Sequence, residues 1–151
     1  MNLEALIRRC MTLAAGAAVA GNPPFGAVLV IAGGTIVGEA ANRQVSAGDP
    51  TAHAEIELLR SASRLGHPPP WRDLLVVSNA EPCSMCASAL VKAGLGALAY
   101  GAPHEPHLDP DLGVAEVFAR SRRPPTVMAG VLAAECAAQI GALRAAAPPP
   151  D

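Results

Sequence analysis

Hydrophobic and polar positions divide the first part of the chain into one helix and two strands. Apolar residues first recur every three or four positions, which is the spacing of a helix with one buried face. They are Leu3, Leu6, Ile7, Cys10, Met11 and Ala14. Residues 26–31 and 35–40 are then predicted as strands, joined across Ala32-Gly33-Gly34 in a hairpin.

A helix is predicted next, running from the region of Thr51 to about Leu65 and stopping at Gly66. Asp49 and Thr51 are its candidate N-cap residues, because both side chains can accept a backbone hydrogen bond. Ile56, Leu59 and Leu65 continue an apolar stripe at roughly helical spacing.

The remaining chain alternates strands with helices. Residues 74–78 form a continuous apolar run, as expected of a strand covered on both faces. Pro82 suits the first position of a helix that ends near Gly94. Later elements are expected at 97–101 (strand), 112–119 (helix), 126–129 (strand) and 131–146 (helix).

This alternation predicts an α/β fold, a three-layer α/β/α sandwich around a central mixed sheet of about five strands. The sheet must be mixed, because so short a hairpin cannot join parallel strands. At 151 residues the chain fits one domain, expected over residues 1–146, with 147–151 as a disordered tail.

Composition narrows the class of protein. Hydrophobic residues make up 51% but aromatic residues only 3%, so the core is expected to consist of Leu, Val, Ile and closely packed Ala. No stretch approaches a transmembrane span, and no membrane partner is expected. The N-terminal segment after Arg8-Arg9 has too little leucine for a signal peptide and keeps helical spacing.

The four cysteines favour a reducing, cytoplasmic location over a disulfide framework. Cys10 and Cys136 are interpreted as buried small hydrophobic residues. The net charge is −2, and no face resembles that of a nucleic-acid-binding protein. The basic run Arg120-Ser121-Arg122-Arg123 is interpreted as a solvated helix end.

Two short motifs carry candidate chemistry, His53-Ala54-Glu55 and Pro82-Cys83-Ser84-Met85-Cys86. Zinc binds nitrogen and sulfur ligands in a tetrahedron, and a catalytic site leaves one of the four positions for water. His53, Cys83 and Cys86 supply three ligands, so we expect one Zn²⁺ per chain. Two thiols three residues apart lie on one helix face, where the helix N-terminus favours their thiolate forms.

Glu55 is predicted as the catalytic acid and base. It lies two residues after His53, a spacing that does not put both side chains on one helix face, so it is not expected to be a ligand. Two thiolates already cancel the charge of a zinc dication, so a nearby base must help remove the proton of water. Glu55 would then deliver this proton to a ring nitrogen and to the departing amine.

Three other uses of these residues remain open. A structural zinc site would be closed by a fourth ligand, such as His104, His107 or Cys136. A redox pair would use Cys83 and Cys86 without the histidine. A zinc-stabilised binding module would bind metal without turnover, and Glu55 and Asn42 would then be dispensable.

The chain resembles the cytidine deaminase-like superfamily, and more narrowly its guanine deaminase and tRNA adenosine deaminase branch. The resemblance runs from about Pro24 to Gly101. It rests on four stretches: residues 24–30, Asn42-Arg43, residues 49–55 and residues 81–87.

The resemblance implies several site residues. Asn42 would hydrogen-bond the substrate base, Phe25 would line or stack on it, and the backbone around Ala54 would contact it. Asn79 stands where these relatives usually carry Thr or Ser, so this pocket-proximal position is a further candidate for substrate binding. The resemblance also implies a homodimer, and Ala87, Leu90 and Val91 would give the second motif's helix extra apolar surface for it.

The expected substrate is a small nucleobase. A tRNA editor needs a positive surface and stacking groups around a flipped base, which this composition disfavours. Guanine fits Asn42 and Phe25 best, while cytosine, its analogues, triazines and nucleosides remain alternatives. The polar segment 102–110 could close over the site, and a second acidic contact could come from Asp109, Asp111 or Glu116.

Overall fold

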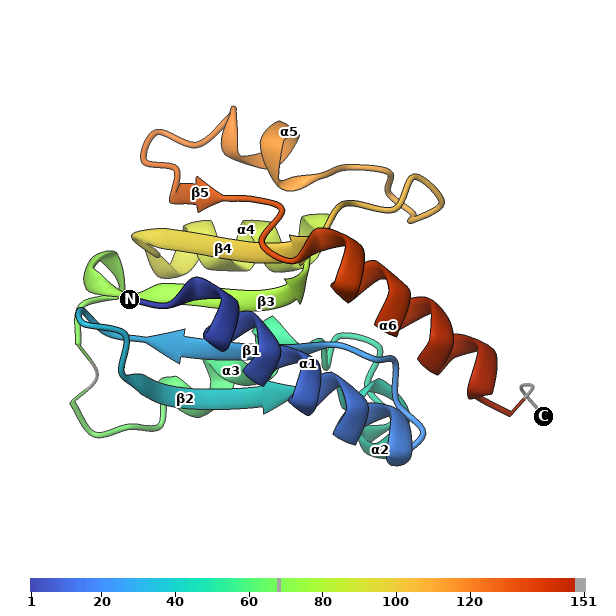
Figure 1. Ribbon diagram of the computed structural model, residues 1–151. Coiled ribbons are helices and arrows are strands. Elements are labelled where there is room, and N and C mark those ends of the chain that lie inside the picture. Colours follow the sequence, from blue (N-terminus) through green and yellow to red (C-terminus); the bar gives the residue numbers. More distant parts are fainter. Residues whose placement is uncertain (68, 149–151) are drawn as a thin grey trace.

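A computed structural model of the protein describes residues 1–67 and 69–148. A five-stranded sheet at its centre has the order β2-β1-β3-β4-β5 (Figure 1). Strand β1 is antiparallel to both of its neighbours, β2 and β3, and β3, β4 and β5 run parallel. The strands are β1 (Gly26–Val30), β2 (Ile36–Ala41), β3 (Leu75–Ala80), β4 (Ala97–Ala102) and β5 (Thr126–Met128).

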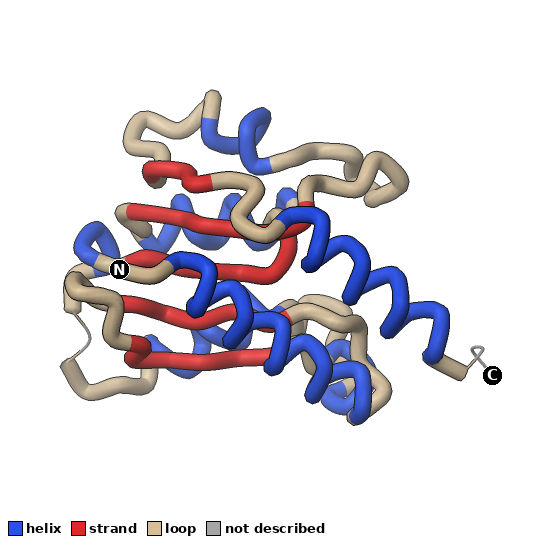
Figure 2. The backbone as a smooth tube through the Cα atoms, in the orientation of Figure 1, coloured by secondary structure: helices blue, strands red, loops and turns tan. Residues whose placement is uncertain are grey.

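Helices cover both faces of the sheet. Two long helices, α1 (Leu3–Val19) and α6 (Ala133–Ala146), lie side by side on one face (Figures 1 and 2). On the opposite face lie α3 (Ala54–Ala62) and α4 (Ser84–Ala93), with the short α5 (Val114–Phe118) packed against α4. The short helices α2 (Gln44–Ala47) and η1 (Trp71–Asp73) lie in connections. This is the α/β fold with a five-stranded mixed sheet that the sequence predicts.

Alternation along the inner strands explains their continuous burial. Leu29 on β1 and Leu98 on β4 point to the core beneath α3 and α4, whereas Val28 and Ala99 point to the core beneath α1 and α6. Successive side chains of a strand face opposite sides, so a strand with helices on both faces buries every residue. All five residues of β1 are buried.

The two remaining cysteines belong to the second of these cores. Cys10 and Cys136 are 0% exposed, as predicted. Burial raises the pKa of both thiols, so they stay protonated. Gly101 makes room for one of them, because a Cβ on this residue would stand 2.4 Å from Cys136 Sγ.

Two local predictions are wrong, and one short helix was not predicted. The N-cap of α3 is His53 itself, and Asp49 Oδ1 instead accepts hydrogen bonds from the amide and hydroxyl of Thr51. The N-cap of α4 is Cys83, so Pro82 precedes the helix and does not open it. The short helix α2 lies in a stretch for which the sequence pattern gave no helix.

Other differences concern helix ends and faces. Helix α3 ends at Ala62 because the packing ends there: its buried apolar residues are Ala54, Leu58 and Ala62, and Leu65 is 46% exposed. Helix α6 begins two residues later than predicted, because Leu132 has left-handed backbone angles (φ 54°). It ends at Ala146 as expected, and the end of the predicted tail, residues 149–151, lies outside the described residues.

The apolar surface proposed for a dimer is also used within the chain. Ala87 and Leu90 are 0% exposed and lie in the core beneath α4, and Val91 packs against that core. No helix in the described ranges is long and apolar enough to cross a membrane.

Candidate metal centre and active site

Two helix N-termini bring the three predicted ligands together. His53 is the N-cap residue of α3, Cys83 is the N-cap residue of α4, and Cys86 lies one turn into α4. Strand β3 ends at Ala80, and the chain reaches Cys83 at the carboxyl end of the parallel strands β3 and β4. His53 Nδ1 lies 3.5 Å from Cys83 Sγ and 3.6 Å from Cys86 Sγ.

These distances fit zinc. With Zn–S bonds of about 2.3 Å and a Zn–N bond of about 2.0–2.1 Å, a tetrahedron has an N···S edge of about 3.5–3.6 Å. All three candidate ligand atoms lie within 4.8 Å of one another. No other group of three or more His, Cys, Asp or Glu residues is assembled in this way within residues 1–67 and 69–148.

A fourth protein ligand from the predicted candidates is not present at this centre. Cys136 is buried on the opposite face of the sheet. His104 Nε2 is 2.6 Å from Asp111 Oδ1, and His107 Nε2 is 3.1 Å from Glu105 Oε2. The three-ligand set therefore resembles an open, catalytic zinc site more than a closed, structural one.

The surroundings of Cys83 favour its thiolate form. The pKa of Cys83 is lowered to about 4, first by the hydrogen bond from Cys86 and then by the hydrogen bond with His53. The hydrogen bond between the two thiols raises the pKa of Cys86. The hydrogen bond between His53 and Cys83 raises the pKa of His53. Metal ligation requires two thiolates and a neutral imidazole, so metal binding must release protons here.

Glu55 lies in the first turn of α3, directly after the ligand-bearing N-terminus, and is almost entirely buried. It is only 5% exposed, and Ser78 Oγ on β3 donates a 2.8 Å hydrogen bond to its Oε1. Burial raises the pKa of Glu55, and the hydrogen bond from Ser78 acts in the opposite direction. A carboxyl group in this setting is suited to both accepting and returning a proton.

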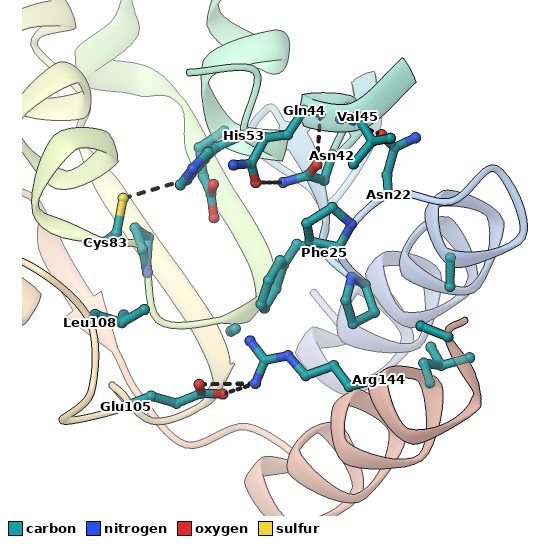
Figure 3. A pocket seen from close by; sticks show the side chains of 18 of the residues that line it. Asn22, Phe25, Asn42, Gln44, Val45, His53, Cys83, Glu105, Leu108 and Arg144 are labelled. Atoms are coloured by element: carbon teal, nitrogen blue, oxygen red, sulfur yellow. Dashed lines mark hydrogen bonds and ion pairs between the residues drawn. The ribbon is translucent and has the colours of Figure 1, made fainter. Parts of the chain in front are cut away.

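A cavity of about 600 Å³ opens in front of His53, Glu55 and Cys83. Its walls come from segments far apart in the sequence, as Figure 3 shows: Phe25 before β1, Asn42 after β2, Glu105 after β4 and Arg144 near the end of α6. Its size is within the usual range for a small-molecule site.

Asn42 is held in a fixed orientation beside this cavity. Its Nδ2 donates to Gln44 Oε1 at 2.7 Å, and its Oδ1 accepts from the Gln44 backbone amide at 2.9 Å. An amide side chain has two donor hydrogens and two acceptor lone pairs, so each polar atom keeps one unused capacity. Asn42 is 1% exposed but is among the residues lining the cavity.

Asn79 does not line the cavity. It is 0% exposed, and its side chain spans the segment on both sides of Phe25. Its Oδ1 accepts from the Gly26 amide at 2.9 Å, and its Nδ2 donates to the Pro24 carbonyl at 3.1 Å. These bonds hold the backbone on both sides of Phe25, and a direct contact of Asn79 with substrate stays a prediction.

Sequence reasoning missed three polar residues that build the site. Ser78 orients Glu55; the only sequence signal was a polar residue at the end of an apolar strand. Asn22 accepts from the amides of Val45 and Ser46 and so fixes α2 beside the cavity. Glu81 accepts from the amides of His104 and Val114 and ties the segment after β4 to the site.

Of the segment predicted to close over the site, only part reaches it. Pro103, Glu105 and Leu108 line the cavity. The three candidates for a second acidic contact, Asp109, Asp111 and Glu116, are not among its lining residues, and neither are His104 and His107. Ala54 is 0% exposed, and its backbone lies at the start of α3 beside His53.

Known proteins contain a zinc-binding region similar to this one. Residues 1–102 match the family described as the cytidine and deoxycytidylate deaminase zinc-binding region. The chain belongs to this family. It is a zinc deaminase, a hydrolase that acts on C–N bonds, and His53, Cys83 and Cys86 form the zinc site typical of the family.

Relatives of this deaminase have different substrates in their names. The chain is 38% identical to a guanine deaminase of Bacillus subtilis over 105 residues, which are 69% of this chain and 67% of that protein. It is 36% identical to a tRNA-specific adenosine deaminase of Haemophilus influenzae over 99 residues, 66% of this chain and 57% of that protein.

A third relative is much longer. A tRNA(Ile)-lysidine synthase of Deinococcus radiodurans is 38% identical over 136 residues, which are 89% of this chain but only 23% of that protein. Among solved structures, a guanine deaminase from Nitrosomonas europaea superimposes with a TM-score of 0.75 at 24% identity, covering 94% of this chain and 84% of that one. This likeness establishes the fold of the deaminase.

Proposed function

We propose that this deaminase hydrolyses the exocyclic amino group of a free nucleobase, with guanine or a close analogue as substrate, and releases ammonia. The observation that carries the choice of a small substrate is the charge of the cavity. Arg144 is the only Lys or Arg among its described lining residues, and Glu105 already pairs with it. An RNA backbone needs cations that are free to bind phosphate.

The position of the basic run supports this choice. Arg120, Arg122 and Arg123 are exposed and precede β5, at the end of the parallel strands opposite to the zinc site. They match the prediction of a solvated basic run. A stem-loop entering the cavity would lie far from them.

In the proposed reaction, His53, Cys83 and Cys86 would hold Zn²⁺, and the bound ion would supply Lewis-acid activation of the attacking water. Glu55 accepts a proton from that water and delivers it to the ring nitrogen next to the reacting carbon. It then takes the second proton and passes it to the departing amine, so that the C–NH₂ bond is replaced by C=O and ammonia leaves. Ser78 keeps the carboxylate turned toward this position through its hydrogen bond.

Three residues are proposed to hold the base. Asn42 has one donor and one acceptor available for a ring edge with the same pattern. Phe25 offers its ring for stacking. The backbone at Ala54 can contact the base beside the metal, since it lies in the first turn of α3.

An ammonia-release screen tests this proposal. It should cover guanine, adenine, cytosine, their nucleosides, aminotriazines and a tRNA anticodon stem-loop. Guanine or a close base analogue should give the highest kcat/KM. Efficient turnover of the stem-loop, or of nucleosides over bases, would place the protein in another branch of its family.

We also propose a homodimer in a reducing, cytoplasmic compartment. Four free thiols support the compartment, and the family resemblance supports the dimer. Static light scattering should give the mass of two chains; a stable monomer at assay concentration would contradict the dimer.

A further inference from the structure

Arg144 connects two other residues at the rim of the cavity. Its guanidinium carbon lies 5.4 Å from the centre of the Phe25 ring, within the range of a cation–π contact. Its Nη1 donates to both carboxylate oxygens of Glu105, at 2.8 and 2.9 Å. Figure 3 shows the arginine reaching from α6 between the aromatic ring and the carboxylate.

The three residues come from separate parts of the chain. Phe25 immediately precedes β1, Glu105 lies three residues after β4, and Arg144 lies two residues before the end of α6. The contacts of Arg144 therefore link the end of α6 to both sides of the cavity mouth.

The contacts of Arg144 with Phe25 and Glu105 lie on the side of the cavity away from the metal ligands. In Figure 3, Phe25 lies between His53 and Arg144. The reacting carbon of a substrate must lie next to the metal ligands, so the opposite edge of the ring faces this rim. In a nucleoside, the sugar is attached on that distal part of the ring system.

We propose that Arg144 and Glu105 form a rim bridge that makes the enzyme selective for free bases over their nucleosides. Arg144 holds the Phe25 ring in place for stacking, and its ion pair with Glu105 occupies the space that a ring-linked sugar would need. This assignment rests on the proposed function and names two specificity-determining residues that do not touch the reacting atoms.

Substitutions of the bridge test the assignment. Arg144→Met keeps most of the aliphatic stem but removes the charge, and Glu105→Gln keeps the size of the side chain. Both substitutions should lower the selectivity ratio, kcat/KM for the base divided by kcat/KM for its nucleoside, about tenfold. The change should come mainly from a higher KM for the base. This size is expected when a partly exposed cation–π contact and ion pair are lost. Arg144→Lys keeps the charge without the planar group and should give an intermediate ratio.

The chain contains a matched control. Arg8 and Glu135 form an Arg–Glu pair between α1 and α6 at 2.7 Å, and neither residue lines the cavity. Arg8→Met should leave the ratio unchanged. Raising the salt concentration should lower the ratio for the wild type but not for Arg144→Met, because salt screens an exposed ion pair. An unchanged ratio in Arg144→Met would overturn the proposal.

A measurement without substrate separates this proposal from the proposed function. Amide hydrogen exchange of the non-proline residues in segments 22–25 and 103–108 should be faster in Arg144→Met and Glu105→Gln than in Arg8→Met; they are Asn22, Phe25, His104, Glu105, His107 and Leu108. If the wild type deaminates neither bases nor nucleosides, the proposed function fails, and exchange decides whether the bridge exists. Equal exchange rates in all these variants would overturn the bridge.

Discussion

At the scale of single residues, two opposing effects act on the pKa of the Glu55 carboxyl group. Removal from water disfavours the carboxylate, and the hydrogen bond from Ser78 favours it. The bond also fixes the direction of the carboxyl group relative to His53 and Cys83. Ser78 is thus a positioning residue for the proposed proton transfer.

Replacing Ser78 with alanine should slow turnover without removing zinc. A hydrogen bond to a charged group contributes about 1.5–3 kcal/mol, so kcat should fall about tenfold to a hundredfold. Ser61→Ala is the control, because its hydroxyl donates to the Leu58 carbonyl within α3. Steady-state kinetics and zinc content of both variants check this; an unchanged kcat in Ser78→Ala would remove Ser78 from the account.

The metal ligands could be predicted from sequence because zinc restricts both residue type and spacing. His53, Cys83 and Cys86 therefore stand out without a structure. Ser78 and Asn22 do not, because a serine or asparagine has many local roles and its partner here lies more than twenty residues away. Only the packed fold reveals which polar group each one meets.

At the scale of elements, the segment around Phe25 depends on one amide side chain. Asn79 satisfies a buried amide and a buried carbonyl on either side of Phe25. A serine or threonine at this position has one hydroxyl and could not span both groups. Asparagine at position 79 is therefore compatible with an ordered Phe25 ring at the cavity.

Asn79→Ala should therefore reduce stability and weaken substrate binding together. Two unsatisfied buried groups should cost about 1–3 kcal/mol each, seen as a lower urea midpoint. KM for the base should rise about twofold to tenfold, corresponding to aromatic stacking worth about 0.5–1.5 kcal/mol.

Gln139→Ala is the matched control for this prediction. Its Nε2 donates to the Met11 carbonyl at 3.0 Å, away from the cavity. It should lower stability but leave KM unchanged. Equal KM values for Asn79→Ala and the wild type would show that Asn79 does not position Phe25.

The segment between β4 and α5 should make stability depend on pH. The hydrogen bond with Asp111 raises the pKa of His104 above its ordinary value near 6.5. The stabilisation is therefore complete below pH 6.5 and is lost as pH rises through the raised pKa. It should stay below about 1 kcal/mol, because the Asp111 side chain is 60% exposed and water screens the pair.

Urea unfolding of the wild type and Asp111→Asn at pH 6 and pH 8.5 checks this dependence. The wild type should exceed the variant in stability at pH 6, and the difference should shrink at pH 8.5. Effects of pH on the zinc site are common to both proteins and cancel. A difference that grows with pH would contradict the role given to His104.

Most elements were predictable because each strand and helix follows the spacing of its apolar residues. The helix starts were not. At α3 and α4 the N-cap positions are occupied by metal ligands, His53 and Cys83, whose side chains make no cap hydrogen bond. The usual capping preferences point instead to Asp49 and Pro82, because function overrides local preference at these two positions.

At the scale of the whole molecule, zinc binding should be coupled to folding. The ligands join the N-termini of α3 and α4, which pack on the same face of the sheet. Cys83→Ala should therefore lose both zinc and thermal stability, as should the wild type after chelation. Cys10→Ala should lose stability through core packing but keep one zinc per chain, and equal zinc loss in both would contradict the assignment.

The central claim is that His53, Cys83 and Cys86 hold zinc while Glu55 performs proton transfer without binding the metal. The most direct measurement compares zinc content and ammonia release in the wild type and Glu55→Gln from parallel preparations. We expect one zinc per chain in both proteins and a fall in turnover of about 10²- to 10⁴-fold in the variant. Loss of zinc from Glu55→Gln, or undiminished ammonia release by it, would contradict the account.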